Sequence, residues 1–159
     1  MSTKAIKFLQ SQGIAFKALP YEHPYEHKIK GAQFAAQALR FPLQRTIKTL
    51  VVHAGSRGYY FVLMPGSDQL DLKILAKVLG VKRAQMADSE TAEKLTGYQT
   101  GGISPFGSKK KLPVIMHKEL LQYDDVLING GQRGLVLLMD PKDIRDITNA
   151  EVYDVAKKG

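Results

Sequence analysis

The stretch Ile47–Met64, IKTLVVHAGSRGYYFVLM, joins two runs of mostly β-branched, aromatic and other apolar residues through a short connection that contains two glycines. The runs Ile47–His53 and Tyr59–Met64 predict two strands, because such residues favour extended backbone. The connection Ala54–Gly58 predicts a turn between them. The stretch therefore predicts a hairpin, and at least part of the sheet that contains it is expected to be antiparallel.

Short helices and strands alternate on both sides of this hairpin. Capping residues, glycine stops and apolar spacing predict helices that begin near residue 3 and at 33–40, 72–79, 89–95 and 142–147. Further strands are expected at 14–19, 113–116, 126–129 and 135–139, and the last two are joined by the turn Gly130–Gly134. This order predicts one α+β domain over residues 1–159 with a largely antiparallel, strongly curved sheet.

Length and composition limit the class of protein. A chain of 159 residues suits one well-buried core. No segment approaches the roughly 20 apolar residues that cross a bilayer, so we expect no membrane association and a cytoplasmic location. The chain has no cysteine, which excludes disulfides, thiolate metal sites and a cysteine nucleophile of its own.

The chain is strongly basic. It has 23 Lys and Arg residues against 15 Asp and Glu residues, a formal net charge of +8. Such a charge favours binding to phosphate-rich polymers or other anionic surfaces. The cations are spread along the chain rather than gathered in a tail, which indicates a folded basic face. They include Lys28, Lys30, Arg40, Arg45, Lys73, Lys77, Lys82, Arg83 and Lys109–Lys111.

The loop Thr96–Pro113, TGYQTGGISPFGSKKKLP, is the strongest candidate for a binding segment. Gly101 and Gly102 let a ligand approach the main-chain N–H groups closely, and Pro105 stiffens the end of the turn. The basic triplet Lys109–Lys111 follows directly. Taken alone, the segment could equally be a surface turn followed by a solvated run of charges.

Other familiar sites are disfavoured. His23 and His27 are four residues apart, but Pro24 disfavours a helix that would align them, and no H-E-x-x-H motif occurs. His53 and His117 are expected to be structural. Segment 102–109, GISPFGSK, has serine where a phosphate-binding loop needs lysine. We therefore expect neither a metal nor any other cofactor.

Lys48 is the most distinctive charged residue of the predicted hairpin. It lies in the segment RTIKTLVV, and the residues that follow it in this segment are mostly apolar. The residue could be an outward-facing strand position. If it points into a cleft near Gly101 and Gly102, its ammonium group and the main-chain donors would form an anion-stabilising site.

Several segments in order resemble the YbaK family of Cys-tRNA(Pro) deacylases, which is homologous to the inserted editing domain of bacterial prolyl-tRNA synthetase. They are Lys48-Thr49-Leu50-Val51, the segment 69–98, GGISPFGSKKKLP and VLINGGQRGL. The resemblance extends from about Tyr21 onward. It implies a mixed, mainly antiparallel sheet flanked by helices, and a pocket for the aminoacyl end of mischarged tRNA(Pro).

The resemblance also implies roles for particular residues. Lys48, Gly101 and Gly102 match the catalytic positions, and Lys109, Lys110 and Lys111 are expected to bind tRNA. The substrate-binding positions are Tyr21, Thr49, Ile103, Ser104 and Pro105. In the family, the thiol of the substrate cysteine attacks the ester that joins this cysteine to the tRNA, and the cysteine is released as a thiolactone. Family members are expected to act beside prolyl-tRNA synthetase.

Two positions depart from the family pattern. Lys30 stands where many relatives carry phenylalanine before Gly31, and Val136 stands where relatives often carry aspartate. The amino-acid preference therefore stays open. Removal of another small residue such as alanine is an alternative activity, and a non-catalytic tRNA- or synthetase-binding module is an alternative of a different class.

Overall fold

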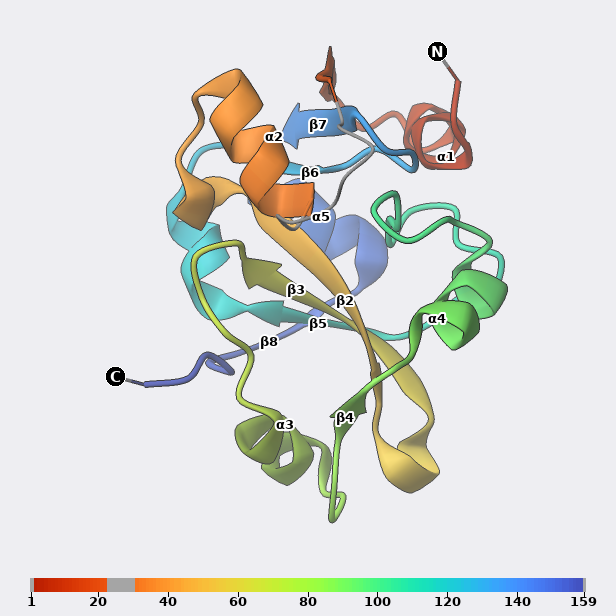
Figure 1. The fold of residues 1–159 in the computed structure, drawn as a ribbon, viewed down its shortest axis with the longest axis vertical. Coiled ribbons are helices and arrows are strands. Elements are labelled where there is room, and N and C mark those ends of the chain that lie inside the picture. The colour runs from red at the N-terminus through yellow and green to blue at the C-terminus, as the bar shows by residue number, and fades with distance from the viewer. Residues whose placement is uncertain (1, 23–30, 159) are drawn as a thin grey trace.

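The computed structural model describes residues 2–22 and 31–158 (Figure 1). The helices are α1 (Lys4–Ser11), α2 (Gly31–Leu39), α3 (Leu72–Leu79), α4 (Ser89–Thr96) and α5 (Pro141–Thr148). The strands are β1 (Lys17–Pro20), β2 (Ile47–His53), β3 (Tyr59–Pro65), β4 (Gln85–Met86), β5 (Val114–His117), β6 (Val126–Asn129), β7 (Leu135–Met139) and β8 (Glu151–Tyr153). None of these helices is long and apolar enough to cross a bilayer.

The strands form two sheets. The larger has the order β4-β2-β3-β5-β8, and the smaller has the order β1-β7-β6. Pairing is antiparallel except between β3 and β5 and between β5 and β8. An isolated parallel bridge between Thr46 and Leu127 connects the two sheets. The expected α+β fold with a mixed, mainly antiparallel sheet is confirmed, and both predicted hairpins form as β2–β3 and β6–β7.

The main core lies between the two sheets, because alternate residues of each strand point to opposite faces. On β3, Phe61 and Leu63 join this core, whereas Val62 and Met64 belong to a second cluster with α3. The smaller sheet is built in the same way. Its inner residues join the main core, and its outer residues pack with α2 in a third cluster. The two sheets and their covering helices therefore hold β2 and β6 firmly beside each other.

Helix ends follow the capping residues in the sequence. The Asp88 side chain accepts a 2.7 Å hydrogen bond from Thr91 N at the start of α4, and Gly97 ends that helix in the left-handed conformation. Arg40 has a φ of 51°, so α2 ends at Leu39, one residue earlier than the sequence predicts. The first strand is also shorter than expected, because β7 offers partners only for Lys17–Pro20.

The short strands β4 and β8 are not predicted by the sequence. β4 has two residues and β8 has three, so neither carries a readable alternation of apolar and polar side chains. β4 matters for the site, because it pairs with β2 only at Val52 and His53. Lys48–Leu50 pair with neither β4 nor β6 among the described residues, so this edge of β2 is open between its pairing with β4 and the bridge from Thr46 to Leu127 of β6.

Candidate active site

A cavity of about 370 Å³ lies along this open edge of β2. One wall is the strand segment Ile47–Leu50, and another wall is made by Thr100, Gly101 and Ile103 of the loop that follows α4. Asn129, at the end of β6, also lines the cavity. The remaining lining comes from the start of α2 and from residues around β4 and α3, namely Gly31, Ala32, Gln69, Leu70, Leu72 and Met86.

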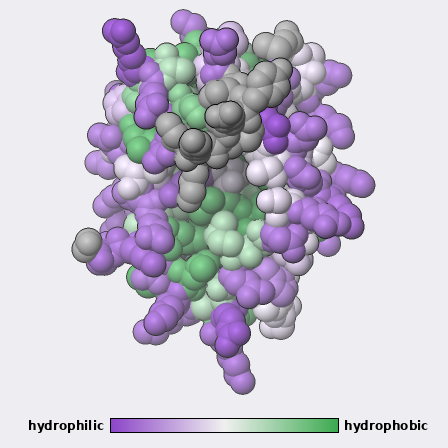
Figure 2. Space-filling model, viewed as in Figure 1, coloured by the Kyte–Doolittle hydropathy of each residue, from purple (hydrophilic) through white to green (hydrophobic). Residues whose placement is uncertain are grey.

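The surface around this part of the molecule is largely apolar. Figure 2 shows a band of hydrophobic surface down the middle of the face that carries α3, β4 and β2 in Figure 1, bordered by hydrophilic side chains. Met86 is the large hydrophobic side chain most exposed in the described chain, at 47%. An apolar pocket with a few polar groups is the usual form of a small-ligand site.

The strand wall contributes Lys48 and Thr49. Both are partly exposed and line the cavity, and the β2–β3 ladder fixes their backbone through the pairs Lys48↔Met64 and Thr49↔Leu63. The Thr49 hydroxyl is buried and has no hydrogen-bond partner among the described residues. A buried hydroxyl without a partner is costly, and a bound ligand can supply the missing hydrogen bond.

The loop wall is formed by a backbone that only glycine adopts easily. Gly101 has a φ of 90°, and a Cβ built on it would lie 3.2 Å from Arg133 Nε. The Asn129 side chain donates a 2.9 Å hydrogen bond to the Gly101 carbonyl and accepts one from Gly131 N. Asn129 therefore connects the loop wall to the β6–β7 turn.

Gly102 does not line the cavity. Its N–H donates a 2.8 Å hydrogen bond to the Gln99 carbonyl, so it serves the turn. A Cβ at this position would come within 2.8 Å of Gln132 Cα, so glycine allows the loop to pack against the turn 130–134. The main-chain donors of the cavity wall are instead Gly101 N and Ile103 N, neither of which donates a hydrogen bond within residues 2–22 and 31–158.

Three of the expected substrate-binding residues lie outside the cavity lining. Tyr21 packs against α2 and the smaller sheet; burial raises the pKa of its phenol, and a hydrogen bond with the Gly134 backbone partly offsets that rise. Ser104 is buried, and its hydroxyl accepts a 3.1 Å hydrogen bond from Phe106 N. Pro105 lines a different cavity, of about 290 Å³, together with Phe8, Lys111 and other residues.

The basic triplet Lys109–Lys111 is exposed on the return of the same loop. Its backbone is fixed, because Lys109 N and Lys110 N donate 2.8 and 2.9 Å hydrogen bonds to the Thr96 and Leu95 carbonyls at the end of α4. The Tyr98 hydroxyl closes the loop by donating to the Phe106 carbonyl, and burial raises the pKa of Tyr98 to about 12. Of the other cations, Arg45 is paired with Asp125, and Lys28 and Lys30 lie outside the described residues.

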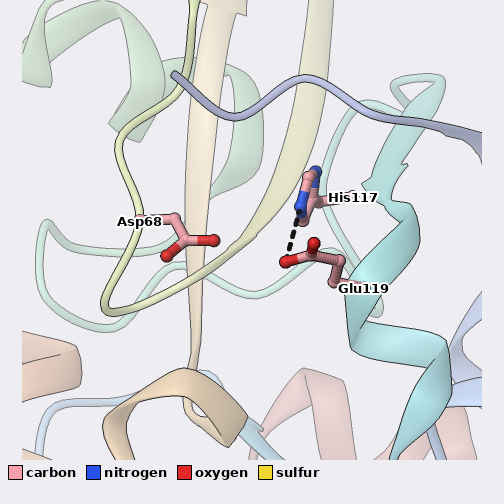
Figure 3. Close-up of side chains that lie close together, drawn as sticks. All are labelled: Asp68, His117 and Glu119. Atoms are coloured by element: carbon pink, nitrogen blue, oxygen red, sulfur yellow. Dashed lines mark ion pairs between the residues drawn. The ribbon is translucent and has the colours of Figure 1, made fainter. Parts of the chain in front are cut away.

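A second group of ionisable side chains lies at the end of β5, where Asp68, His117 and Glu119 face one another (Figure 3). His117 is 1% exposed, and its Nε2 lies 3.5 Å from Glu119 Oε2. Its Nδ1 accepts a 3.2 Å hydrogen bond from Val155 N, so the proton of the neutral ring sits on Nε2, where a metal would need a lone pair. This chemistry suits a structural contact between the His117 imidazole and the Glu119 carboxylate better than a metal site. The other histidine pair of the sequence analysis, His23 and His27, lies outside the described residues.

Several lining residues are missed by the sequence analysis. Asn129 carries a visible signal, since a polar residue ends an apolar strand just before Gly130-Gly131. Thr100 lies within the loop 96–113 already singled out, and Gly31 follows Lys30, which was also singled out. Gln69, Leu70, Leu72 and Met86 carry no such signal, because only the packing of α3 and β4 beside β2 brings them to the cavity.

A family model described as the aminoacyl-tRNA editing domain matches residues 26–147. The chain belongs to this family, and its activity is the deacylation of aminoacyl-tRNA. The match over most of the chain, together with the cavity, supports an enzyme rather than a binding module.

Individual relatives agree with this class. A protein of Enterococcus faecalis named as a Cys-tRNA(Pro)/Cys-tRNA(Cys) deacylase, EbsC, is 31% identical over 156 residues, which cover 98% of this chain and 94% of that protein. A proline–tRNA ligase of Xanthomonas campestris is 25% identical over 138 residues, or 82% of this chain and 24% of the ligase. A crystal structure described as a trans-editing enzyme for prolyl-tRNA synthetase has a TM-score of 0.86 at 28% identity and covers 99% of both chains.

Proposed function

We propose that this deacylase acts in trans on Cys-tRNA(Pro), beside prolyl-tRNA synthetase, and releases free tRNA. The observation that carries the proposal is the cavity that Lys48 and Thr49 of β2 line together with Gly101 and Ile103. Its walls offer a cation and two main-chain N–H groups, which suit the carbonyl oxygen of an ester as negative charge develops on it. The name of the E. faecalis relative supports cysteine as the amino acid removed.

The proposed reaction uses the thiol of the substrate. The cysteine sulfur attacks the carbonyl carbon of its own ester, so that an S–C bond forms and the C–O bond to the ribose breaks. The ribose oxygen takes up the proton that the thiol gives up and leaves as the free hydroxyl of the tRNA, and the other product is a four-membered thiolactone. Because the attack is intramolecular, the protein has to fold the substrate and stabilise the oxyanion, and it needs no nucleophile of its own.

Each residue then has a proposed task. The Lys48 ammonium group stabilises the oxyanion together with Gly101 N–H and Ile103 N–H, and the Thr49 hydroxyl hydrogen-bonds the bound aminoacyl group. Lys109–Lys111 attract the phosphates of the tRNA. Gly102 shapes the loop, and Tyr21, Ser104 and Pro105 support the surrounding structure from outside the lining.

Removal of alanine is the second candidate activity. Val136, where relatives often carry aspartate, is 3% exposed and packs with Leu127 and Ala35 rather than lining the cavity. The apolar side chains Ile47, Leu70 and Leu72 would accept alanine or cysteine. An alanyl ester offers no thiol, so its removal would require attack by water.

The test is a deacylation panel with the purified protein and tRNA(Pro) charged with cysteine, alanine or proline. We expect rapid release of cysteine, slower release of alanine and no release of proline. A preference for the alanyl ester would favour the second candidate, and no release from any of the three would refute both.

A further inference from the structure

The loop wall of the pocket carries an arrangement that the proposed reaction does not by itself require. Two oppositely charged side chains from different elements hold the two ends of a single residue, Thr100. Glu93 Oε2, on α4, accepts a 2.7 Å hydrogen bond from Thr100 N. Arg133 Nε, in the turn between β6 and β7, donates a 2.8 Å hydrogen bond to the Thr100 carbonyl.

Both contacts are charge-assisted hydrogen bonds. The hydrogen bond from Thr100 lowers the pKa of the Glu93 carboxyl. The positive charge of Arg133 lowers this pKa further. The Arg133 side chain also lies directly against Gly101, as shown by the 3.2–3.6 Å distances from a Cβ built there to its Nε, Cγ and Cδ. Neither Glu93 nor Arg133 lines the cavity, so each reaches the loop wall only through its contacts with Thr100 and Gly101.

Peptide geometry turns these contacts into a constraint on the site. In a trans peptide the carbonyl and the following N–H point in opposite directions. Arg133, by binding the Thr100 carbonyl, therefore directs the Gly101 N–H away from itself, and Thr100 and Gly101 both line the cavity. Asn129 holds the Gly101 carbonyl by a hydrogen bond in the same way, and the N–H of the same peptide, Gly102 N–H, points to the Gln99 carbonyl.

We propose that Glu93 and Arg133 form a clamp on Thr100 that positions the Gly101 N–H for catalysis. The proposal rests on the function proposed above, in which this N–H stabilises the oxyanion. Both are positioning residues, since they act through Thr100 and Gly101 and do not touch the substrate. The clamp also connects the helix that precedes the loop to the turn that packs against it.

A simpler role for Arg133 is a direct contact with a tRNA phosphate, because the side chain is exposed. The two roles differ in what they change. A phosphate contact affects KM, and lysine at position 133 would largely preserve it. A positioning role affects kcat, and lysine would not reproduce the planar Nε–H donor that lies against Gly101.

The experiment compares Glu93→Ala, Glu93→Gln, Arg133→Ala, Arg133→Lys and the double alanine variant in steady-state deacylation of Cys-tRNA(Pro). Glu90→Ala and Lys94→Ala are matched controls, because this exposed pair lies on the same helix and neither residue lines the cavity. We expect kcat to fall about ten-fold in the single alanine variants with KM little changed. Glu93→Gln, which keeps an acceptor, should recover part of the rate.

Two results distinguish a clamp from independent contacts. The double variant should lose little more than either single variant, because both side chains hold the same residue. Hydrogen–deuterium exchange of the segment 99–103 should accelerate in the alanine variants and stay unchanged in the controls. A raised KM with activity kept in Arg133→Lys, or unchanged exchange in Glu93→Ala, would overturn the clamp.

The exchange measurement needs no substrate turnover. If the wild-type protein deacylates none of the charged tRNAs, the proposed function fails. The exchange rates would then still decide whether Glu93 and Arg133 hold the loop.

Discussion

The two walls of the pocket are fixed by different interactions. The strand wall, with Lys48 and Thr49, is held along its length by the β2–β3 ladder, so its side chains contribute little to its position. The loop wall, with Thr100, Gly101 and Ile103, has no ladder and depends on the side chains of Glu93, Asn129 and Arg133. Substitutions on the strand wall should therefore change chemistry, whereas those around the loop wall should change geometry.

Lys48→Ala is expected to have the largest effect. Loss of a charge that stabilises the oxyanion should lower kcat for Cys-tRNA(Pro) by about 10²–10³-fold. Circular dichroism and thermal unfolding should match the wild type, since the ladder holds β2 without this side chain. Lys48→Met, which keeps the aliphatic stem, should be equally inactive. Normal turnover in either folded variant would remove Lys48 from the mechanism.

Gly101→Ala should have the next largest effect. The new methyl group would meet the Arg133 side chain at a backbone φ of 90°, so the loop must shift and the Gly101 N–H must turn. We expect kcat to fall at least ten-fold. Gly13→Ala is the control, because Gly13 has a φ of 69° and open space around it. Equal rates for Gly101→Ala and Gly13→Ala would show that the loop wall tolerates movement.

Gly102→Ala tests the support of the loop rather than its donors. A Cβ at this position would lie within 3.0 Å of the backbone of Gln132 and Arg133, which cannot yield as a flexible side chain can. We expect a lower melting temperature together with a lower rate. A variant with normal stability but no activity would instead indicate that Gly102 takes part directly in catalysis.

Charge reversal of Lys109–Lys111 should have the smallest effect on chemistry. The triplet is exposed and outside the main cavity, so KM for tRNA should rise while kcat and the preference for cysteine over alanine stay the same. The dependence of log KM on log salt concentration should become shallower, by about one unit for each tRNA phosphate that the variant no longer neutralises. As a comparison at single positions, Lys110→Glu should raise KM for tRNA more than Lys142→Glu, which changes a lysine on α5. Unchanged salt dependence would place the tRNA elsewhere.

The sequence predicts the strand wall better than the loop wall. Lys48 is visible as a charge within an apolar strand, and the β2–β3 pairing follows from local composition. Gly101 and Gly102 are both visible as candidates, but their different tasks are not. Those tasks depend on Gln99, Asn129 and the turn 130–134, and the last two are distant in sequence from the loop.

The remaining differences have a similar cause. Glu93 and Arg133 look like ordinary surface charges in the sequence, since nothing local indicates that both reach Thr100. The positions of Tyr21 and Ser104 outside the lining depend on how α2 and the loop pack. Propensity and capping predict elements, whereas contacts between elements decide which of their residues share a site.

The central claim is that the pocket promotes attack by the substrate's own thiol. The most direct measurement compares the deacylation rates of Cys-tRNA(Pro) and Ser-tRNA(Pro) by the wild-type protein and identifies the first product released. We predict similar KM values, a much lower kcat for the seryl ester, and cysteine thiolactone as the first product. Equal kcat values for the two esters, or an acyl group trapped on the protein, would contradict the account and show that water or a side chain is the nucleophile.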